Sequence, residues 1–193
     1  DELTAHEFAL QRMVVDAVHQ LPIQQEALAA DLILDGGSAF GKLQGNIVSQ
    51  LTIPFATDPS QPAEEQPITA IINHRAAADA ELRKRAQEAE IKGWESIRTT
   101  VAACLNHVKG TALTMMQRRG WDHPLDEALD KNRIDRPTLD AMMGAIEEHF
   151  PTFRRYFGAK AKKLGQDRLH WWDLFAPVGE SHTVYDWPAA REL

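Results

Sequence analysis

Residues 118–177 read RRGWDHPLDEALDKNRIDRPTLDAMMGAIEEHFPTFRRYFGAKAKKLGQDRLHWWDLFAP, and this stretch predicts the fold more directly than any other part of the chain. Gly120 marks the end of one helix, because glycine readily adopts the backbone conformation that closes a helix. Pro124 and Pro137 each mark a helix start, where the missing N–H of proline costs nothing. Gly165 marks a further helix end. The stretch therefore predicts short amphipathic helices joined by turns, followed by an aromatic, non-helical segment.

Apolar periodicity within the same stretch favours helices as well. Large apolar residues recur there at helical spacing and form one stripe, at Leu139, Met142, Met143 and Ile146. We expect Pro151 to end or kink this helix. The basic residues beyond it are expected on a solvated helix face; they are Arg154, Arg155, Lys160, Lys162 and Lys163.

The first 50 residues also predict helices. Thr4-Ala5-His6-Glu7 has the pattern of a capping box, so a helix is expected from there to about His19. A second helix is expected to start at Pro22 and to end at Gly36-Gly37, and Ser38 is the expected cap of a third. The candidate core residues of the first helix are Phe8, Met13, Val14 and Val18.

The pattern changes at Leu51. From there Leu51, Ile53 and Phe55 alternate with other residues at the two-residue period of a β-strand. Pro54 lacks the N–H that a ladder needs, so this strand is expected at a sheet edge. Residues 67–70 are expected to return as a second strand, which predicts a small antiparallel hairpin on a helical body.

The whole chain is therefore predicted to be mainly α-helical and to have four parts. These are N-terminal helices at 1–50, a β-hairpin at 51–70, a helical body at 71–182 and the start of a helix at 183–193.

Three helix signals lie outside the stretch quoted first. Asp79 is the predicted N-cap of the longest helix, and Gly93 is a point at which that helix can break. Asp186 is the predicted cap of the last helix. Less than two turns follow it, which is marginal for an isolated helix, so we expect the native chain to continue beyond Leu193.

Composition excludes several classes of function. The formal charge is −7, with basic residues interspersed among acidic ones, so no nucleic-acid partner is expected. A single cysteine excludes an internal disulfide and favours a reducing compartment, so we expect a cytoplasmic protein. No run of eighteen apolar residues occurs, so no membrane partner is expected.

Cys104 and His107 are three residues apart on the longest predicted helix, a spacing that suits a thiol–imidazole pair or half of a zinc site. Catalysis would also need an orienting acid and an oxyanion hole, and zinc would need two more ligands. The sequence marks none of these groups. A buried structural cysteine beside a polar histidine is the favoured interpretation, and a metal or redox role is the alternative.

A set of short motifs occurs in one order along residues 119–177. They are Arg119-Gly120 with a following aromatic residue, Pro124-Leu125, Ala128-Leu129, Asn132-Arg133-Ile134-Asp135, Leu139-Asp140-Ala141, Phe153-Arg154-Arg155-Tyr156, Ala159-Lys160-Ala161-Lys162, Leu164-Gly165 and Trp172-Asp173-Leu174-Phe175-Ala176-Pro177. This order resembles the region upstream of the catalytic domain in oligoendopeptidase F, a zinc metallopeptidase of the thimet-oligopeptidase type. Arg83, Arg85-Ala86 and Trp94 extend the resemblance towards the N-terminus. Trp121 stands where the family more often has tyrosine.

The resemblance implies zinc held by a His-Glu-x-x-His motif and by a glutamate on a neighbouring helix. That motif is absent from these 193 residues; the nearest string, His6-Glu7-Phe8-Ala9-Leu10, ends in leucine. Two ligands on one helical face need a spacing of four, so His6 has no partner. We therefore expect the catalytic part beyond Leu193, with zinc in the parent enzyme and none bound by this chain.

The aromatic segment near the end of the quoted stretch supplies the candidate site residues. An extended backbone is expected there, because Pro177 biases the residue before it away from helix. Trp171 and Trp172 would then point in opposite directions, so that one belongs to the core and the other faces a cleft. The alternative is that both cover the helical core. The resemblance makes Trp171, Trp172 and Asp173 candidate lining residues of a substrate channel.

These observations lead to two hypotheses. In the first, the chain is the N-terminal, channel-forming part of an oligoendopeptidase F-like zinc metalloendopeptidase that hydrolyses short peptides, and this chain alone is inactive. Its partners are then short peptide substrates and its own C-terminal catalytic domain. In the second, it is a free-standing helical module that binds peptides or a partner without catalysis, through an aromatic groove near Trp171 and Trp172.

Overall fold

The structure is a computed structural model that describes residues 2–179 and 185–192. The fold is mainly α-helical with one two-stranded antiparallel sheet, which confirms the predicted fold class. The chain divides into two compact units. Unit 1 contains residues 1–51 and 94–147, and unit 2 contains residues 52–93 and 148–193.

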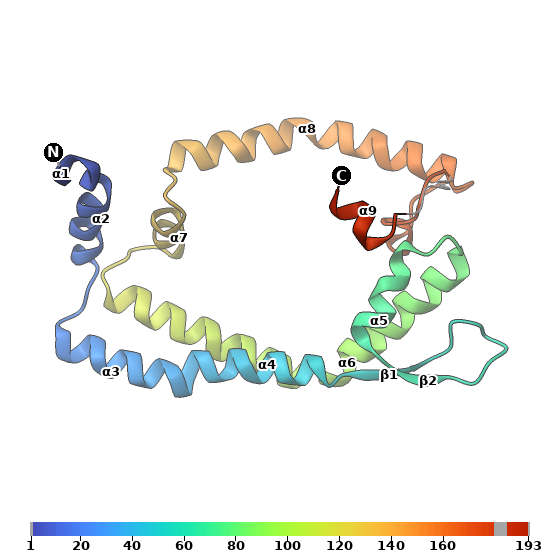
Figure 1. Cartoon of the computed structure of the whole chain (residues 1–193), viewed down its shortest axis with the longest axis horizontal. Coiled ribbons are helices and arrows are strands. Elements are labelled where there is room, and N and C mark those ends of the chain that lie inside the picture. The colour runs from blue at the N-terminus through green and yellow to red at the C-terminus, as the bar shows by residue number, and fades with distance from the viewer. Residues whose placement is uncertain (1, 180–184, 193) are drawn as a thin grey trace. The chain divides into compact units, whose positions relative to one another are not determined.

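The helices and strands are labelled in Figure 1. In chain order they are α1 Glu2–Ala5, α2 Glu7–Val18, α3 Ile23–Ile33, α4 Ala39–Ser49, β1 Thr52–Phe55, β2 Glu64–Pro67, α5 Ile68–Asn73, α6 Ala80–Arg118, α7 Pro124–Asn132, α8 Arg136–Lys163 and α9 Trp187–Arg191. Helices α6 and α8 each continue from one unit into the other.

The N-terminal helix α2 ends close to His19, as predicted, but it begins differently. Thr4 lies inside α1, and the residue that precedes α2 is His6, whose side chain makes no capping bond, so the predicted capping box is wrong. No residue of α2 is buried. The core positions predicted on this helix are therefore wrong as well, because their side chains are 59–73% exposed.

The double glycine after α3 breaks the helix, as predicted, because a kink with non-helical backbone angles at Gly36 separates α3 from α4. A π turn at Leu34–Ser38 spans this kink, and Ser38 makes no side-chain cap, so its predicted capping role is wrong. A Cβ atom on Gly37 would lie 3.1 Å from Cβ of Thr111 on α6. Glycine is needed at this position because the turn passes close to α6, along which α3 and α4 run (Figure 1).

The turns of the quoted stretch follow the prediction closely. Gly120 and Gly165 both have positive φ, at 74° and 73°, and each follows the end of a helix. His123 caps α7 by accepting a hydrogen bond from the N–H of Leu125 at 3.0 Å. Pro151 does not end the helix, because α8 continues through it, and the alternative of a kink stays a prediction. Proline removes one intrahelical donor, and the turns on both sides stay helical.

The hairpin of unit 2 confirms the strand predicted from Leu51 onwards. β1 pairs with β2 in antiparallel register, with Ile53 opposite Gln66. Ile53 and Phe55 are buried and alternate with exposed residues, as the two-residue period requires. The second strand lies earlier than the predicted residues 67–70. β2 ends at Pro67, and buried Ile68 already begins α5.

Gly93 does not interrupt the longest helix, because α6 runs unbroken past it. A Cβ atom at Gly93 would lie 2.2 Å from Cδ1 of Ile53 and 3.3 Å from Cδ1 of Ile68. The glycine therefore serves packing, since it lets the hairpin and α5 approach the helix. Ile53 and Ile68 at this contact are both buried; other buried apolar residues of unit 2 are Phe55, Ile71 and Ala86.

The C-terminal helix α9 confirms its predicted cap, since Oδ1 of Asp186 accepts a hydrogen bond from the N–H of Ala189 at 2.9 Å. The predicted boundary between residues 182 and 183 lies outside the described residues. Among the helices that the structure describes, none is both long enough and apolar enough to cross a lipid bilayer.

Candidate functional site at the tryptophan turn

The site in unit 2 is built on the first turns of α6. Oδ1 of Asp79 accepts a hydrogen bond from the N–H of Glu81 at 2.9 Å, which confirms Asp79 as the N-cap. One turn into the helix, the side chain of Arg83 is only 3% exposed. A buried guanidinium needs hydrogen-bond acceptors for its donors, and these come from two separate segments of the chain.

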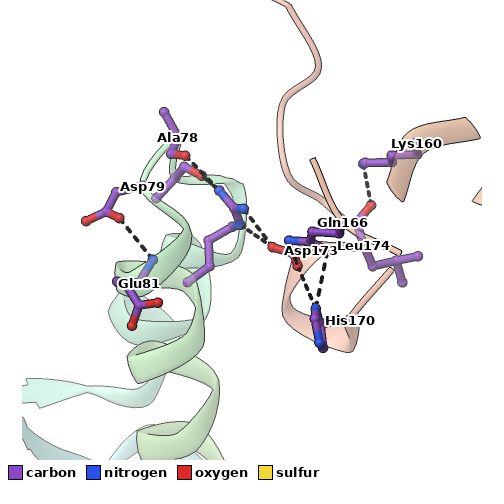
Figure 2. Close-up of polar contacts among 10 residues, drawn as sticks. Ala78, Asp79, Glu81, Lys160, Gln166, His170, Asp173 and Leu174 are labelled. Atoms are coloured by element: carbon purple, nitrogen blue, oxygen red, sulfur yellow. Dashed lines mark hydrogen bonds and ion pairs between the residues drawn. The ribbon is translucent and has the colours of Figure 1, made fainter. Parts of the chain in front are cut away.

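Arg83 binds the loop before its own helix and a residue 90 positions later. Its Nη1 donates to the carbonyl oxygens of Ala77 and Ala78 at 2.7 and 2.8 Å. Its Nε and Nη2 donate to Oδ1 of Asp173 at 3.1 and 2.6 Å (Figure 2). This ion pair is buried on both sides and fixes the segment around Asp173 against the start of α6.

Asp173 is fully buried, and its second oxygen is also satisfied. Nε2 of Gln166 donates to Oδ2 at 2.8 Å, and Nδ1 of His170 lies 3.5 Å from the same atom (Figure 2). Burial acts to raise the pKa of Asp173. The hydrogen bonds from Arg83 and Gln166, with the charge of Arg83, outweigh burial and hold this pKa below its ordinary value. Asp173 is therefore a carboxylate at neutral pH.

The two neighbouring tryptophans lie on a single 3-10 turn at Trp171–Asp173, which we call the tryptophan turn. The backbone there is not extended, contrary to the prediction. The N–H of Asp173 donates to the carbonyl of His170 at 3.0 Å, which closes the turn. The bias from Pro177 acts only on the residue before it, so it leaves this turn free to form. Trp172 stacks on the ring of His170 with centroids 4.6 Å apart, whereas Trp171 is 71% exposed.

A second buried cation holds the chain immediately after this turn. Nζ of Lys160, on α8, donates to the carbonyl oxygen of Leu174 at 2.8 Å, and the Lys160 side chain is buried (Figure 2). The sequence predicted this lysine on a solvated face, which is wrong. Lys162 and Lys163, its neighbours on the same helix, are exposed as predicted.

The three residues predicted to line a channel therefore come together on one turn but have different surroundings. Trp171 faces solvent, Trp172 is half-buried, and Asp173 is enclosed as the counter-ion of Arg83. A channel-lining role remains a prediction for all three. Sequence reasoning missed Arg83 and Lys160 as the residues that anchor the turn. Arg83 and Asp173 both belong to the motifs that carry the family resemblance, which was the available signal for this pair.

Cys104 and His107 show no metal-site geometry. Cys104 is buried, and the ring of His107 stacks on Phe40 with centroids 4.1 Å apart. Across residues 2–179 and 185–192, no three His, Cys, Asp or Glu side chains lie together as a metal site requires. The groups that are described therefore do not fit a zinc ion.

Unit 1 contains a polar cleft of about 700 Å3 beside α2 and α7. Arg12 donates to both carboxylate oxygens of Asp130 at 2.7 and 2.8 Å, and this hydrogen bonding holds the pKa of Asp130 below its ordinary value. His19 stacks on Trp121 with centroids 3.5 Å apart. Every described Asp, Glu, Lys and Arg side chain that lines the cleft is in an ion pair except Arg133, whose guanidinium lies over the ring of Phe8.

Comparison with known proteins identifies relatives of one kind. No family model matches the chain. Oligopeptidase PepF of Bacillus subtilis is 24% identical over 180 residues, which cover 92% of this chain and 27% of that protein. The plasmid oligoendopeptidase F of Lactococcus lactis subsp. cremoris is 31% identical over 98 residues, which cover 50% of this chain and 16% of that protein.

Solved structures give the same fold. The oligoendopeptidase-F of Enterococcus faecium matches with a TM-score of 0.75 and 20% identity, over 92% of this chain and 35% of that one. A candidate peptidase of Chlamydophila abortus matches with a TM-score of 0.81 and 21% identity, over 98% of this chain and 32% of that one. The chain thus spans about a third or less of the length of these relatives. In sequence and in fold, it is similar to the N-terminal region of oligoendopeptidase F-like peptidases.

Proposed function

We propose that this chain is the N-terminal, channel-forming part of an oligoendopeptidase F-like zinc metalloendopeptidase that hydrolyses short peptides. The observation that carries the proposal is the similarity to oligopeptidase PepF over 92% of the chain. The parent's substrates are then short peptides, and the chain's own partner is the C-terminal catalytic domain. The single, buried Cys104 is consistent with a reducing compartment, and we place the parent in the cytoplasm.

Within this function the tryptophan turn acts as a fixed wall element for peptide substrates. Trp171 is exposed, and the two anchors lie just after it in the chain: Arg83 holds the side chain of Asp173, and Lys160 holds the carbonyl of Leu174. A rigid aromatic surface loses little conformational entropy when a peptide packs on it. Tryptophan is among the residues that contribute most to binding at such contacts.

Zinc would be supplied by the part of the parent outside this chain. The 193-residue sequence lacks the His-Glu-x-x-His motif, and the described donor groups do not form a metal site. When bound in the parent, zinc would supply a polarised peptide carbonyl and an activated water. The residues of this chain take no part in that step and act in binding and positioning the peptide.

The test compares the parent gene product with the 193-residue chain, using a quenched-fluorescent peptide as substrate. We expect cleavage by the parent, loss of cleavage when zinc is chelated, and no cleavage by the chain alone. Zinc-dependent cleavage by the chain alone would overturn the assignment of catalysis to the other part. Absence of cleavage by the zinc-loaded parent on a panel of short peptides would overturn the peptidase function.

A substitution in the parent tests the role of the turn. We expect Trp171→Ala to raise KM about tenfold with kcat nearly unchanged. The peptide loses a packing contact that it makes equally in the ground state and in the transition state. Trp187→Ala is the matched control, because Trp187 is also highly exposed but lies on α9. Equal effects of the two substitutions, or no change with Trp171→Ala, would remove the tryptophan turn from the substrate path.

A further inference from the structure

A groove of about 640 Å3 runs between α3 and residues 106–118 of α6, within unit 1. This volume lies in the range typical of ligand-binding pockets. Leu28 and Leu32 of α3 form one wall and are 59% and 64% exposed. Met115 of α6 lies opposite them. Two large apolar side chains thus stand open to solvent along one side of a concave surface.

The position of Gly110 keeps the groove open. Gly110 lines the groove from the middle of α6, and a Cβ atom added there would meet no other atom within 4 Å. Glycine inside a helix costs about 0.5–1 kcal/mol relative to alanine. No close packing requires it here, in contrast to Gly93. A side chain at position 110 would instead stand in the open volume.

The described lining of the groove has a basic residue at one end and no acidic residue. Among the described residues that line it, Arg118 is the one Lys or Arg side chain, and no Asp or Glu side chain is present. Arg118 lies at one end, and it forms no ion pair with any residue in the described part of the chain. This differs from the polar cleft beside α2, where the described Asp, Glu, Lys and Arg side chains other than Arg133 form ion pairs. The groove therefore complements a ligand with an apolar body and one negative end.

The polar residues of the groove distinguish between two ligands of that kind. The side chains of Gln25, Asn106 and Thr114 line the groove and bind no other described residue. Amides and a hydroxyl can bond the backbone N–H and C=O groups of a peptide, whereas an acyl chain has no use for them. From Asn106 to Arg118, α6 rises about 18 Å, which is the length of about five extended residues.

We propose that this groove binds the C-terminal end of an extended apolar peptide of about five residues. The terminal carboxylate pairs with Arg118, and the apolar side chains pack on Leu28 and Leu32. The inference rests on the proposed function only in taking peptides as the ligand class. It involves no cleavage and does not use the tryptophan turn, which belongs to unit 2.

The test is fluorescence anisotropy with the 193-residue chain and fluorescein-labelled Ala-Leu-Ala-Phe-Leu, prepared with a free C-terminal carboxylate or with a C-terminal amide. We expect saturable binding of the acid and about fivefold weaker binding of the amide, the size of one exposed ion pair. Arg118→Gln should weaken binding of the acid by the same factor and leave no difference between the two peptides.

A second variant tests the location. Gly110→Phe should weaken binding of the acid by more than about tenfold, since the ring takes the place of the ligand. Gly41→Phe is the matched control: Gly41 lies on α4, a Cβ there also meets no atom within 4 Å, and it does not line the groove. Circular dichroism checks that each variant has the wild-type helix content.

Three outcomes would overturn the proposal. These are no saturable binding of the acid at about 1 mM chain, equal affinity of wild type for acid and amide, and equal weakening by Gly110→Phe and Gly41→Phe. Decanoate is the competing probe: if it binds at the groove while the peptide does not, the ligand is an acyl carboxylate and the peptide assignment is wrong. Because no turnover is measured, this result is independent of the peptidase test.

Discussion

Replacing Asp173 by alanine should destabilise the chain by about 3 kcal/mol. Breaking a buried ion pair from one side costs about 3–5 kcal/mol, because the other charge stays buried without a partner. In this case Arg83 loses both bonds to Oδ1 of Asp173, and Gln166 loses its bond to Oδ2. Arg83 keeps the carbonyl oxygens of Ala77 and Ala78, so we expect the lower end of that range.

The assay is thermal unfolding followed by circular dichroism. For a chain of this length, a loss of about 3 kcal/mol should lower Tm by roughly 6–12 °C. Asp140→Ala is the control, because it removes an exposed ion pair to Arg136 within α8 and should leave Tm unchanged. The double variant Arg83→Met with Asp173→Leu should recover much of the loss, since it leaves no buried charge.

The same pair predicts a dependence on pH. The folded-state pKa of Asp173 is lowered, so its ionised form favours folding at every pH above the unfolded pKa of about 3.9. That contribution is lost as pH falls through the folded-state value. The Tm difference between wild type and Asp173→Ala should therefore be constant from about pH 7 to pH 5 and shrink below about pH 4. A Tm change under about 2 °C at pH 7 would refute the reasoning.

Two further predictions use matched pairs of variants. Gly93→Ala should destabilise the chain by about 1–3 kcal/mol in urea unfolding, because the added Cβ overlaps Ile53. The Cβ of Gly144→Ala meets no atom within 4 Å, so this control should stabilise the chain by about 0.5–1 kcal/mol. Equal signs for the two would contradict the packing role of the glycine. Lys160→Met should make the chain after the tryptophan turn susceptible to limited chymotrypsin cleavage, because the hydrogen bond to the carbonyl of Leu174 is lost. Lys162→Met, at an exposed position, should leave the cleavage rate unchanged.

The helix boundaries that could be read from the sequence are those set by local chemistry. The stop at Gly120 and the caps at Asp79 and Asp186 each depend on a residue and its nearest neighbours in the chain. The prediction for Gly93 was wrong for the opposite reason. The role of Gly93 is set by Ile53, forty residues earlier, and nothing in its own neighbourhood indicates that contact.

The candidate site shows the same limit. Periodicity and composition can identify an aromatic segment, and they did so for Trp171 and Trp172. They cannot show that Asp173 meets Arg83 across 90 residues of chain. The lining role predicted for these residues came from the family resemblance, and the residue pattern left open that the tryptophans cover the helical core. The burial and pairing of Asp173 depend on the contact between this turn and the start of α6.

The hairpin of unit 2 disfavours edge-to-edge association between copies of this chain. A two-stranded sheet has two open edges, and open edges invite pairing with strands of other molecules. Register pairs Thr52 with Pro67 and Pro54 with Glu65. Hydrogen-bonded and non-bonded residue pairs alternate along an antiparallel sheet, and a proline has no N–H to donate. We therefore infer that the hydrogen-bonded pairs are Ile53–Gln66 and Phe55–Glu64. Each proline then removes a donor from one outer edge, which makes both edges poor templates for intermolecular β-sheet.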